Sequence, residues 1–245
     1  MRRFQSLAPF TVLGLIIVVA PGLSSAGPQA DEYALRRRQM VAEQLAVRDI
    51  KDARVLETLG KVPRHLFVPP PLWDRAYEDY PLPIGDDQTI SQPYIVALMT
   101  QSLDLKGGEK VLEVGTGSGY QAAVLAGFSG RVFSIEINPD LASRAARLLA
   151  ELGYANITVK TGDGFFGWPA EAPFDDIMVT CAVEAVPPAL LRQLREGGRL
   201  ILPLGAAGQT QVLTLVTKTR GRAVSRQILD VRFVPMTGAA RDRRR

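Results

Sequence analysis

The stretch that decides the fold is Val111-Leu-Glu-Val-Gly115-Thr-Gly117-Ser-Gly119-Tyr120. A short apolar strand pattern runs directly into three glycines at alternate positions, and a helix-forming run, Gln121 to Ala126, follows. Glycine has no Cβ and tolerates positive φ, so this turn lets the backbone pass close to a ligand. The spacing, G-x-G-x-G, differs from the G-x-G-x-x-G fingerprint of dinucleotide-binding proteins. The turn therefore predicts a nucleoside-type ligand, in a variant that points away from NAD.

Strand and helix patterns alternate from residue 107 onward. Apolar runs predict five strands, and two later segments that alternate in polarity predict a terminal antiparallel pair. The expected strands cover Lys110–Val114, Arg131–Ile137, Ile157–Lys160, Asp176–Thr180, Leu200–Pro203, Gln211–Thr217 and Val224–Phe233. Helix patterns lie between them, over Pro139–Leu152 and Pro188–Leu194. This alternation indicates an α/β, Rossmann-like fold: a mostly parallel sheet with helices on both faces and a C-terminal antiparallel strand pair.

Composition divides the chain into four regions, residues 1–26, 27–106, 107–237 and 238–245. The first is predicted to be a signal peptide: Arg2 and Arg3 precede an apolar run from Leu7 to Ala20, and Ser24-Ser-Ala26 offers a cleavage site. The apolar run is shorter than the roughly 20 residues of a membrane span. We expect an exported, periplasmic protein without stable membrane association after cleavage. An uncleaved anchor is the alternative.

Residues 27–106 are expected to form a helical region that ends in an ordered loop. Asp52 and Ser91 are candidate N-caps, because each precedes apolar residues at helical spacing. The expected elements are a flexible leader over Gly27–Glu32, helices over Tyr33–Val47, Asp52–Gly60 and Tyr94–Gln101, and a loop over residues 72–92.

The composition limits the available chemistry. The 245 residues suit one globular domain with a formal net charge of +4. Four arginines between residues 241 and 245 are interpreted as a solvated, frayed tail, because no basic stripe with interleaved aromatic residues indicates nucleic-acid binding. The single cysteine, Cys181, excludes an intramolecular disulfide and a cysteine zinc cluster, and is interpreted as a packing residue. The single histidine, His65, is interpreted as structural or exposed, and no metal site is expected.

Two further features fall at the ends of predicted strands, where an open α/β sheet binds its ligand. Glu136 ends the second strand and could accept hydrogen bonds from both ribose hydroxyls, and Asp163-Gly164 follows the third strand, where it could meet an adenine edge. Glu113 lies near the glycine turn and suits a cation better than a pyrophosphate. S-Adenosyl-L-methionine carries a sulfonium cation and no phosphate, so these residues favour it as the cofactor.

Several motifs together closely resemble the protein-L-isoaspartate O-methyltransferase family. The similarity runs from about Arg38 to Pro235, and the Gln-Thr-Ile-Ser-Gln-Pro block is its most specific part. The motifs are Val62-Pro-Arg-His-Leu-Phe-Val68, Leu82-Pro-Ile-Gly85-Asp-Asp-Gln88-Thr89-Ile90-Ser91-Gln92-Pro93, the glycine turn, Gly162-Asp-Gly164, Pro173-Phe-Asp175 and Arg232-Phe-Val-Pro235.

The resemblance implies a class I S-adenosylmethionine-dependent methyltransferase acting on the α-carboxyl of L-isoaspartyl residues in damaged proteins and peptides. The methyl ester then closes to a succinimide, which reopens partly to normal aspartate. Ser91 matches the family's active-site serine. The cofactor-binding positions that match are Gly115, Gly117, Glu136, Asp163 and Gly164; from the residues themselves, Glu113 and Gly119 are added to this set.

The residues agree with this chemistry. A carboxylate has a reference pKa of about 4, so it needs no general base to attack a sulfonium methyl. We expect the hydroxyls of Thr89 and Ser91, with backbone N–H groups at the start of the next helix, to orient the acceptor carboxylate. The alternative is that Ser91 only caps that helix.

One segment departs from the family pattern. Thr180-Cys-Ala-Val-Glu184-Ala-Val-Pro187 carries a charge where the family is usually small and uncharged, so Glu184 could alter acceptor preference or face solvent. Two other functions stay open: a methyltransferase of the same fold acting on a small molecule, and a non-catalytic binding protein that retains the fold. Export would also require a source of S-adenosylmethionine outside the cytoplasm.

Overall fold

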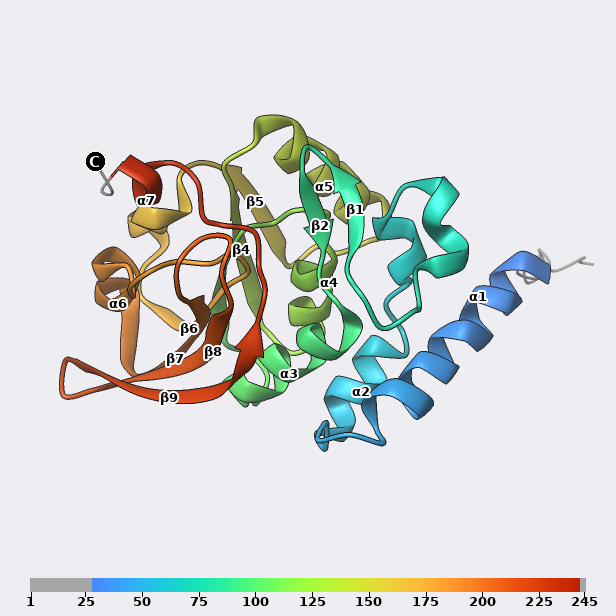
Figure 1. Ribbon diagram of the computed structural model, residues 1–245, viewed down its shortest axis with the longest axis horizontal. Coiled ribbons are helices and arrows are strands. Elements are labelled where there is room, and N and C mark those ends of the chain that lie inside the picture. Colours follow the sequence, from blue (N-terminus) through green and yellow to red (C-terminus); the bar gives the residue numbers. More distant parts are fainter. Residues whose placement is uncertain (1–27, 243–245) are drawn as a thin grey trace, which may run out of the picture.

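A seven-stranded sheet forms the centre of the molecule, in a computed structural model that describes residues 28–242 (Figure 1). The strand order is β5-β4-β3-β6-β7-β8-β9. The strands are β3 Lys110–Val114, β4 Arg131–Glu136, β5 Ile157–Thr161, β6 Phe174–Val179, β7 Leu194–Leu204, β8 Gln211–Thr219 and β9 Arg222–Val231. The first five in this order run parallel, and β8 and β9 are antiparallel. The predicted parallel sheet with a C-terminal antiparallel pair is confirmed.

Helices cover both faces of the sheet, as predicted. One face packs against α3 (Pro93–Leu103), α4 (Tyr120–Ala126) and α5 (Pro139–Glu151). The other face packs against α6 (Pro188–Gln193) and the 3-10 turn η4 (Gly164–Phe166), with η5 (Pro169–Glu171) beyond it. Neighbouring residues of β3 divide between the two cores, because successive strand side chains point to opposite faces: Val111 joins the first core and Leu112 the second.

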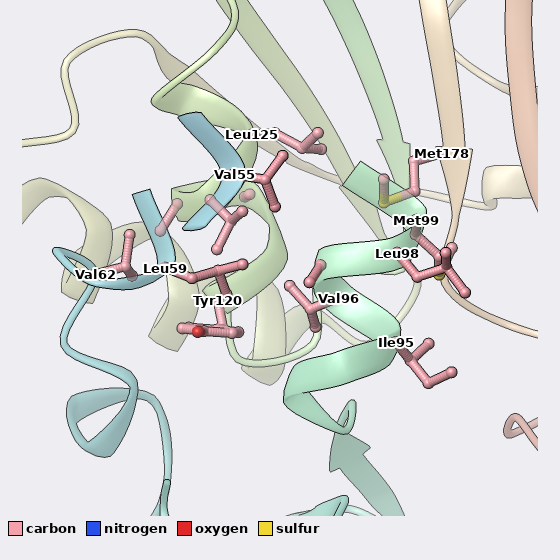
Figure 2. Close-up of a cluster of buried hydrophobic side chains, with 14 of the residues drawn as sticks. Val55, Leu59, Val62, Ile95, Val96, Leu98, Met99, Tyr120, Leu125 and Met178 are labelled. Carbon is pink, nitrogen blue, oxygen red and sulfur yellow. The ribbon is translucent and has the colours of Figure 1, made fainter. Parts of the chain in front are cut away.

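The N-terminal region packs onto the first of these cores. Figure 2 shows Val55 and Leu59 beside Val96, Tyr120 and Leu125, so helices before and after the glycine turn share one apolar cluster. The elements of this region are α1 Pro28–Gln39, the π-helical turn η1 Met40–Leu45, α2 Ala53–Leu59, the 3-10 turns η2 Arg64–Phe67 and η3 Pro70–Arg75, and the strands β1 Leu82–Gly85 and β2 Gln88–Ile90. Asp52 caps α2, as predicted, by accepting a hydrogen bond from the Arg54 N–H.

Three expectations about local structure are wrong. The flexible leader is helical from Pro28, since α1 begins there. The loop over residues 72–92 contains the β1–β2 hairpin. Strand β7 begins at Leu194 rather than at Leu200, because Leu194 pairs with Phe174 of β6 and the chain then bulges before Arg199 pairs with Asp176. Gly197 and Gly198 therefore lie within β7, at this bulge.

The segment after β9 returns across the end of the sheet. Ala182 exchanges backbone hydrogen bonds with Val234 and Met236, and α7 (Ala239–Asp242) follows. The short helix α7 reaches Asp242, so the backbone at Arg241 is helical rather than frayed, and the other three arginines of the predicted tail lie outside the described residues.

The predicted signal peptide, residues 1–26, lies outside the described residues. Among the helices of residues 28–242, none has the length and apolar character needed to cross a membrane.

Candidate active site

A cavity of about 270 Å³ lies where the strand order reverses, between the carboxyl ends of β3 and β6. This is the position at which open α/β sheets bind ligands. Seven parts of the chain meet around it. They are residues 88–91, 96, 114–118 with 120–121, 135–138, 164, 180–181 and 234–237.

The glycine turn forms one wall of this cavity. Gly115 has φ +99° and its N–H bonds the Ile135 carbonyl at 2.8 Å. A Cβ at this position would overlap the Thr180 hydroxyl. That hydroxyl lies 2.7 Å from the Gly115 carbonyl oxygen and 3.0 Å from that of Val114, both within hydrogen-bonding distance. Thr180, directly after β6, therefore fixes the turn and leaves room only for glycine at position 115.

Glu136 lies at the end of β4 and faces the same cavity. One carboxylate oxygen accepts the Gly117 N–H at 2.9 Å and the other accepts the Asn138 N–H at 3.0 Å. The side chain is 7% exposed. A carboxylate has about four acceptor sites, so each oxygen can accept one more hydrogen bond. The geometry thus leaves Glu136 able to bind a pair of vicinal hydroxyls.

Glu113 does not line the cavity, contrary to the expectation that it faces the cofactor directly. Its side chain is fully buried under the turn, and its Oε2 accepts a hydrogen bond from Ser134 at 2.5 Å. Ser134 is joined in turn to the Thr116 hydroxyl at 2.6 Å, and Thr116 lines the cavity. Burial, with a smaller effect of Glu136, raises the pKa of Glu113 to about 8. Glu113 therefore supports the turn as a largely neutral acid near pH 7.

Gly119 and Asp163 also lie behind the cavity wall. Gly119 precedes α4 and packs against Leu149 of α5. The Asp163 carboxylate accepts the Phe165 N–H at 2.9 Å and the Ala239 N–H at 2.8 Å. Gly164, the next residue, lines the cavity, and a Cβ there would overlap Val114. Asp163 is therefore held by the C-terminal segment beside the site, and its adenine contact stays a prediction.

Thr89 and Ser91 reach the cavity from β2 and from the connection to α3. Ser91 is half-buried and does not cap the helix: Gln92 occupies the N-cap position without a side-chain bond, and Pro93 follows it. The capping expectation is wrong, because α3 begins at Pro93 and its N-cap is Gln92 rather than Ser91. The Ser91 hydroxyl therefore remains available to a bound molecule.

A second cavity of about 650 Å³ adjoins the first. Four residues line both: Thr89, Ser91, Thr180 and Val234. The second cavity extends past the start of α3 to the end of β9, with Arg48 and Arg232 on its walls. Thr89 and Ser91 thus lie on the wall between the two cavities.

From the sequence, His65 is interpreted as structural or exposed, and Cys181 as a packing residue. His65 stacks on Tyr33 with ring centroids 4.2 Å apart, its Nδ1 lies 2.7 Å from the Tyr77 hydroxyl, and it lines neither cavity. Cys181 is half-buried on the wall of the first cavity, and burial raises the pKa of its thiol to about 12. A neutral thiol is a weak nucleophile. Glu184 is exposed and lines neither cavity.

Sequence reasoning missed several lining residues. Thr180 carried a signal, since it ends the fourth predicted strand at the same edge as the glycine turn. Asn138 carried another, because Asn-Pro commonly opens a helix, and here it caps α5. The segment Val234–Thr237 had no local signal for this position, since only the packing of the chain after β9 brings it to the cavity.

The chain is similar in sequence to known proteins over most of its length. A family model described as Protein-L-isoaspartate(D-aspartate) O-methyltransferase matches residues 35–241. Protein-L-isoaspartate O-methyltransferase 2 of Shewanella sediminis is 58% identical over 211 residues, which cover 86% of each chain. Protein-L-isoaspartate O-methyltransferase 2 of Anaeromyxobacter sp. is 50% identical over 238 residues, or 95% of this chain and 97% of the relative.

Solved structures show the same similarity in fold. A protein-L-isoaspartate O-methyltransferase superposes with a TM-score of 0.74 at 29% identity, over 87% of this chain and 69% of the other. A Plasmodium falciparum structure assigned to the same enzyme, in complex with S-adenosyl-L-homocysteine, superposes with a TM-score of 0.70 at 27% identity, over 82% of this chain and 98% of the other.

Proposed function

The chain belongs to the protein-L-isoaspartate(D-aspartate) O-methyltransferase family, and we propose that it transfers a methyl group from S-adenosyl-L-methionine to the α-carboxyl of L-isoaspartyl residues in damaged proteins and peptides. The observation that carries the proposal is the meeting of the glycine turn, Glu136 and the Thr89–Ser91 segment around one cavity. The family match covers each of these parts.

The cavity suits the proposed cofactor. Gly115, Gly117 and Gly164 let the backbone close on an adenosyl group, and Glu136 keeps acceptor capacity for the ribose hydroxyls. Asp163 is the proposed partner of the adenine edge, held by its own backbone bonds. Glu113 and Gly119 act indirectly, through the turn and through the start of α4. When bound, the cofactor supplies an electrophilic methyl group on a sulfonium.

The acceptor needs orientation more than activation. Its carboxylate is ionised at neutral pH, so no proton has to be removed before attack. Thr89 and Ser91 donate hydrogen bonds to one carboxylate oxygen and leave the other free to attack. The first N–H groups of α3, at Tyr94 and Ile95 on the wall of the second cavity, lack intrahelical partners and favour an anion. Aligning the reacting atoms in this way can lower a barrier by several kcal/mol.

The bonds balance without a covalent enzyme intermediate. A carboxylate oxygen forms the new bond to the methyl carbon as the carbon–sulfur bond breaks, and the electron pair returns to sulfur as a neutral thioether. The following backbone amide nitrogen then attacks the methyl ester, loses its proton and expels methanol, which leaves a succinimide. Water opens the succinimide to aspartate or isoaspartate.

The second cavity supports a peptide acceptor over a small molecule. At about 650 Å³ it is larger than the cofactor cavity, and it opens along β9. Arg232 on its wall suits a carboxylate-bearing chain, beside Asp230 and beside Arg48, which is paired with Asp79 at 2.6 Å. A small acceptor would leave most of this space to water.

Export is proposed on the sequence of residues 1–26, with the periplasm as destination. The basic start, the short apolar run and the small residues before the cleavage site support it. N-terminal sequencing of the protein purified from fractionated cells tests this: a mature chain starting at Gly27 is the expected result, and an intact Met1 in the membrane fraction would indicate the anchor instead.

Methyl transfer to a matched pair of peptides tests the activity. An isoaspartyl peptide should accept label from methyl-labelled S-adenosylmethionine and release labelled methanol, and the aspartyl peptide of the same sequence should not. Ser91→Ala should lower kcat/KM by about tenfold or more, the scale of one hydrogen bond at an oriented carboxylate. Equal inactivity on both peptides with intact cofactor binding would favour the small-molecule alternative, and absence of cofactor binding would favour the non-catalytic one.

A further inference from the structure

Arg64, the first residue of η2, is the largest completely buried side chain among the described residues. Arginine is rarely fully buried unless it is paired with a carboxylate. Here its hydrogen bonds run to backbone carbonyls: Nε donates to the Ala76 carbonyl and Nη2 to the Ser91 carbonyl, both at 2.7 Å. The guanidinium thus fixes the backbone of the segment proposed to hold the acceptor.

The same guanidinium contacts the cofactor side of the site. Its central carbon lies 4.8 Å from the ring centroid of Tyr120, within the range of a cation–π interaction. Tyr120 is the first residue of α4, directly after the glycine turn, and it lines the cofactor cavity. Phe67, also in η2, packs edge-on against the Tyr120 ring at 5.5 Å. Figure 2 shows this tyrosine between Leu59 and Val96, enclosed by α2 and α3.

The hydrogen bond from Arg64 to the Ser91 carbonyl restrains more than one atom. The peptide group is planar, so holding the Ser91 carbonyl oxygen fixes the plane that joins Ser91 to Gln92. The Gln92 side chain gives a second anchor, because its Nε2 donates to the Asp79 carbonyl at 2.9 Å. With the Ser91 carbonyl and the Gln92 side chain both held, the Ser91 Cα is fixed in place, and the hydroxyl can move only by rotation about the bonds next to that Cα.

A purely stabilising role would not require an arginine. Removing a cation from water costs several kcal/mol, and apolar replacements of buried ionic groups are often neutral or stabilising. An apolar side chain could fill the space beside Tyr120, but it could not also hold two carbonyl groups at a set distance from the ring. The presence of an arginine at position 64 is therefore best explained by its ability to hold these groups in a fixed arrangement.

We propose that Arg64 is a positioning residue for methyl transfer: it ties the Ser91 backbone to Tyr120 and so sets the acceptor carboxylate at the correct distance and angle from the cofactor. This inference rests on the proposed function. Arg64 lines neither cavity, so it acts only through Ser91 and Tyr120.

The experiment compares wild type with Arg64→Lys, which keeps the charge but cannot bond both carbonyls in one plane. The affinity for S-adenosyl-L-homocysteine is measured by calorimetry. The values of kcat and KM are measured with an isoaspartyl peptide at saturating cofactor. Arg64→Lys should lower kcat by up to about 100-fold, the scale of a misplacement near 1 Å. Its affinity for S-adenosyl-L-homocysteine should stay within about threefold of wild type, a difference below 1 kcal/mol.

Arg199→Ala is the matched control. Arg199 also donates to a backbone carbonyl, that of Leu103 at 2.7 Å, and lines neither cavity. It should lower the free energy of unfolding without changing kcat. If Arg64→Lys keeps wild-type kcat, or if kcat, cofactor affinity and folded fraction fall together, the positioning role is overturned. If wild type itself transfers no methyl group to the peptide, the proposed function fails and this inference fails with it.

Chemical rescue gives a second, independent readout. Arg64→Ala leaves a cavity of guanidinium shape, so guanidinium chloride, well below denaturing concentration, should raise its kcat in a saturable way. The same salt should not raise the kcat of Arg199→Ala or of wild type. Absence of rescue in an Arg64→Ala protein that still binds S-adenosyl-L-homocysteine normally would contradict the proposal.

Discussion

The Asp163 carboxylate is held in position by the backbone of Gly238 and Ala239, which packs directly against it. Its carboxylate accepts the Ala239 N–H, and Gly238, at φ +71°, is so close that an added Cβ would lie 2.5 Å from Asp163 Oδ2. Gly238→Ala should therefore displace the carboxylate and weaken S-adenosyl-L-homocysteine binding by about tenfold, a loss of 1.4 kcal/mol. Calorimetric titration measures this effect.

Gly208→Ala is the control for backbone strain. Gly208 has φ +75° and nothing within 4 Å of an added Cβ, so it carries the same conformational cost without the contact. Both variants should lose about 1–2 kcal/mol of unfolding free energy. Equal cofactor affinities in the two variants would mean that Asp163 is not held through Gly238.

Glu113 makes stability depend on pH in a definite direction. Burial raises its pKa to about 8, so between about pH 4 and pH 8 the folded protein holds a proton that the unfolded chain releases. This contribution is complete below about pH 4 and is lost as the pH rises through 8. From pH 5 to 8, urea unfolding should show wild type losing stability faster than Glu113→Gln, by at most about 1.4 kcal/mol per pH unit.

Asp176 does not affect the difference in stability between wild type and Glu113→Gln. Burial also raises the pKa of Asp176, to about 6, but the residue is present in both proteins and its effect cancels in the difference. Parallel stability profiles for wild type and Glu113→Gln would show that Glu113 is ionised in the folded state.

At the scale of elements, the sequence predicted the strands and helices that have a clear hydrophobic period, and it missed the short β1–β2 hairpin. The apolar run Val111–Val114 can only be a buried strand, and its glycine turn follows from residue type. The β1–β2 hairpin was missed because its strands have only four and three residues and its turn is Asp86-Asp87 rather than Asn-Gly. Both aspartates adopt positive φ, and Asp86 pairs with Arg144 of α5 at 2.6 Å. A tertiary ion pair thus accompanies a turn that local propensity disfavours.

His65 is one of the groups against which α1 packs. Tyr33 of α1 stacks on His65, and Arg37 donates to the Gly60 carbonyl at 2.8 Å. Burial first, and then the nearby Arg37 charge, lowers the pKa of His65 to about 4. Because the chain has a single histidine, its imidazole proton signal can be followed without overlap. An NMR titration should give a pKa near 4, and Tyr33→Leu should move that pKa upward.

The sign for stability is opposite to that of Glu113. Between about pH 6.5 and 4 the unfolded chain binds a proton at His65 that the folded protein does not, so stability is lost as the pH falls through this range. His65→Gln should be insensitive to pH at this position. A measured pKa near 6.5 in the folded protein would show that α1 does not enclose the ring.

At the scale of the whole molecule, the sequence could predict only those parts of the site that lie at the ends of parallel strands. Glu136, the glycine turn and Gly164 follow from the rule that ligands bind at the carboxyl ends of parallel strands. Residues 234–237 reach the same cavity only through tertiary packing, which no local pattern encodes. Ligand binding should therefore stabilise the fold as a unit. S-Adenosyl-L-homocysteine at 100 times its Kd should add about 2.7 kcal/mol to the free energy of unfolding.

Hydrogen exchange separates a global effect from a local one. Protection should rise in α3, in the glycine turn and in residues 234–237 together, since all three border the cavity. Glu136→Gln at the same ligand concentration is the control and should show less protection in all three. Protection confined to the glycine turn would mean that the C-terminal segment does not close the site.

The wall that the two cavities share has a kinetic consequence. Thr89, Ser91, Thr180 and Val234 border both spaces, so donor and acceptor can be present at once and meet across that wall. Burial raises the pKa of the Cys181 thiol to about 12, so this thiol is a poor acceptor for the methyl group and no methylated enzyme intermediate is expected. Turnover then requires a ternary complex, and double-reciprocal plots at several fixed peptide concentrations should intersect rather than run parallel.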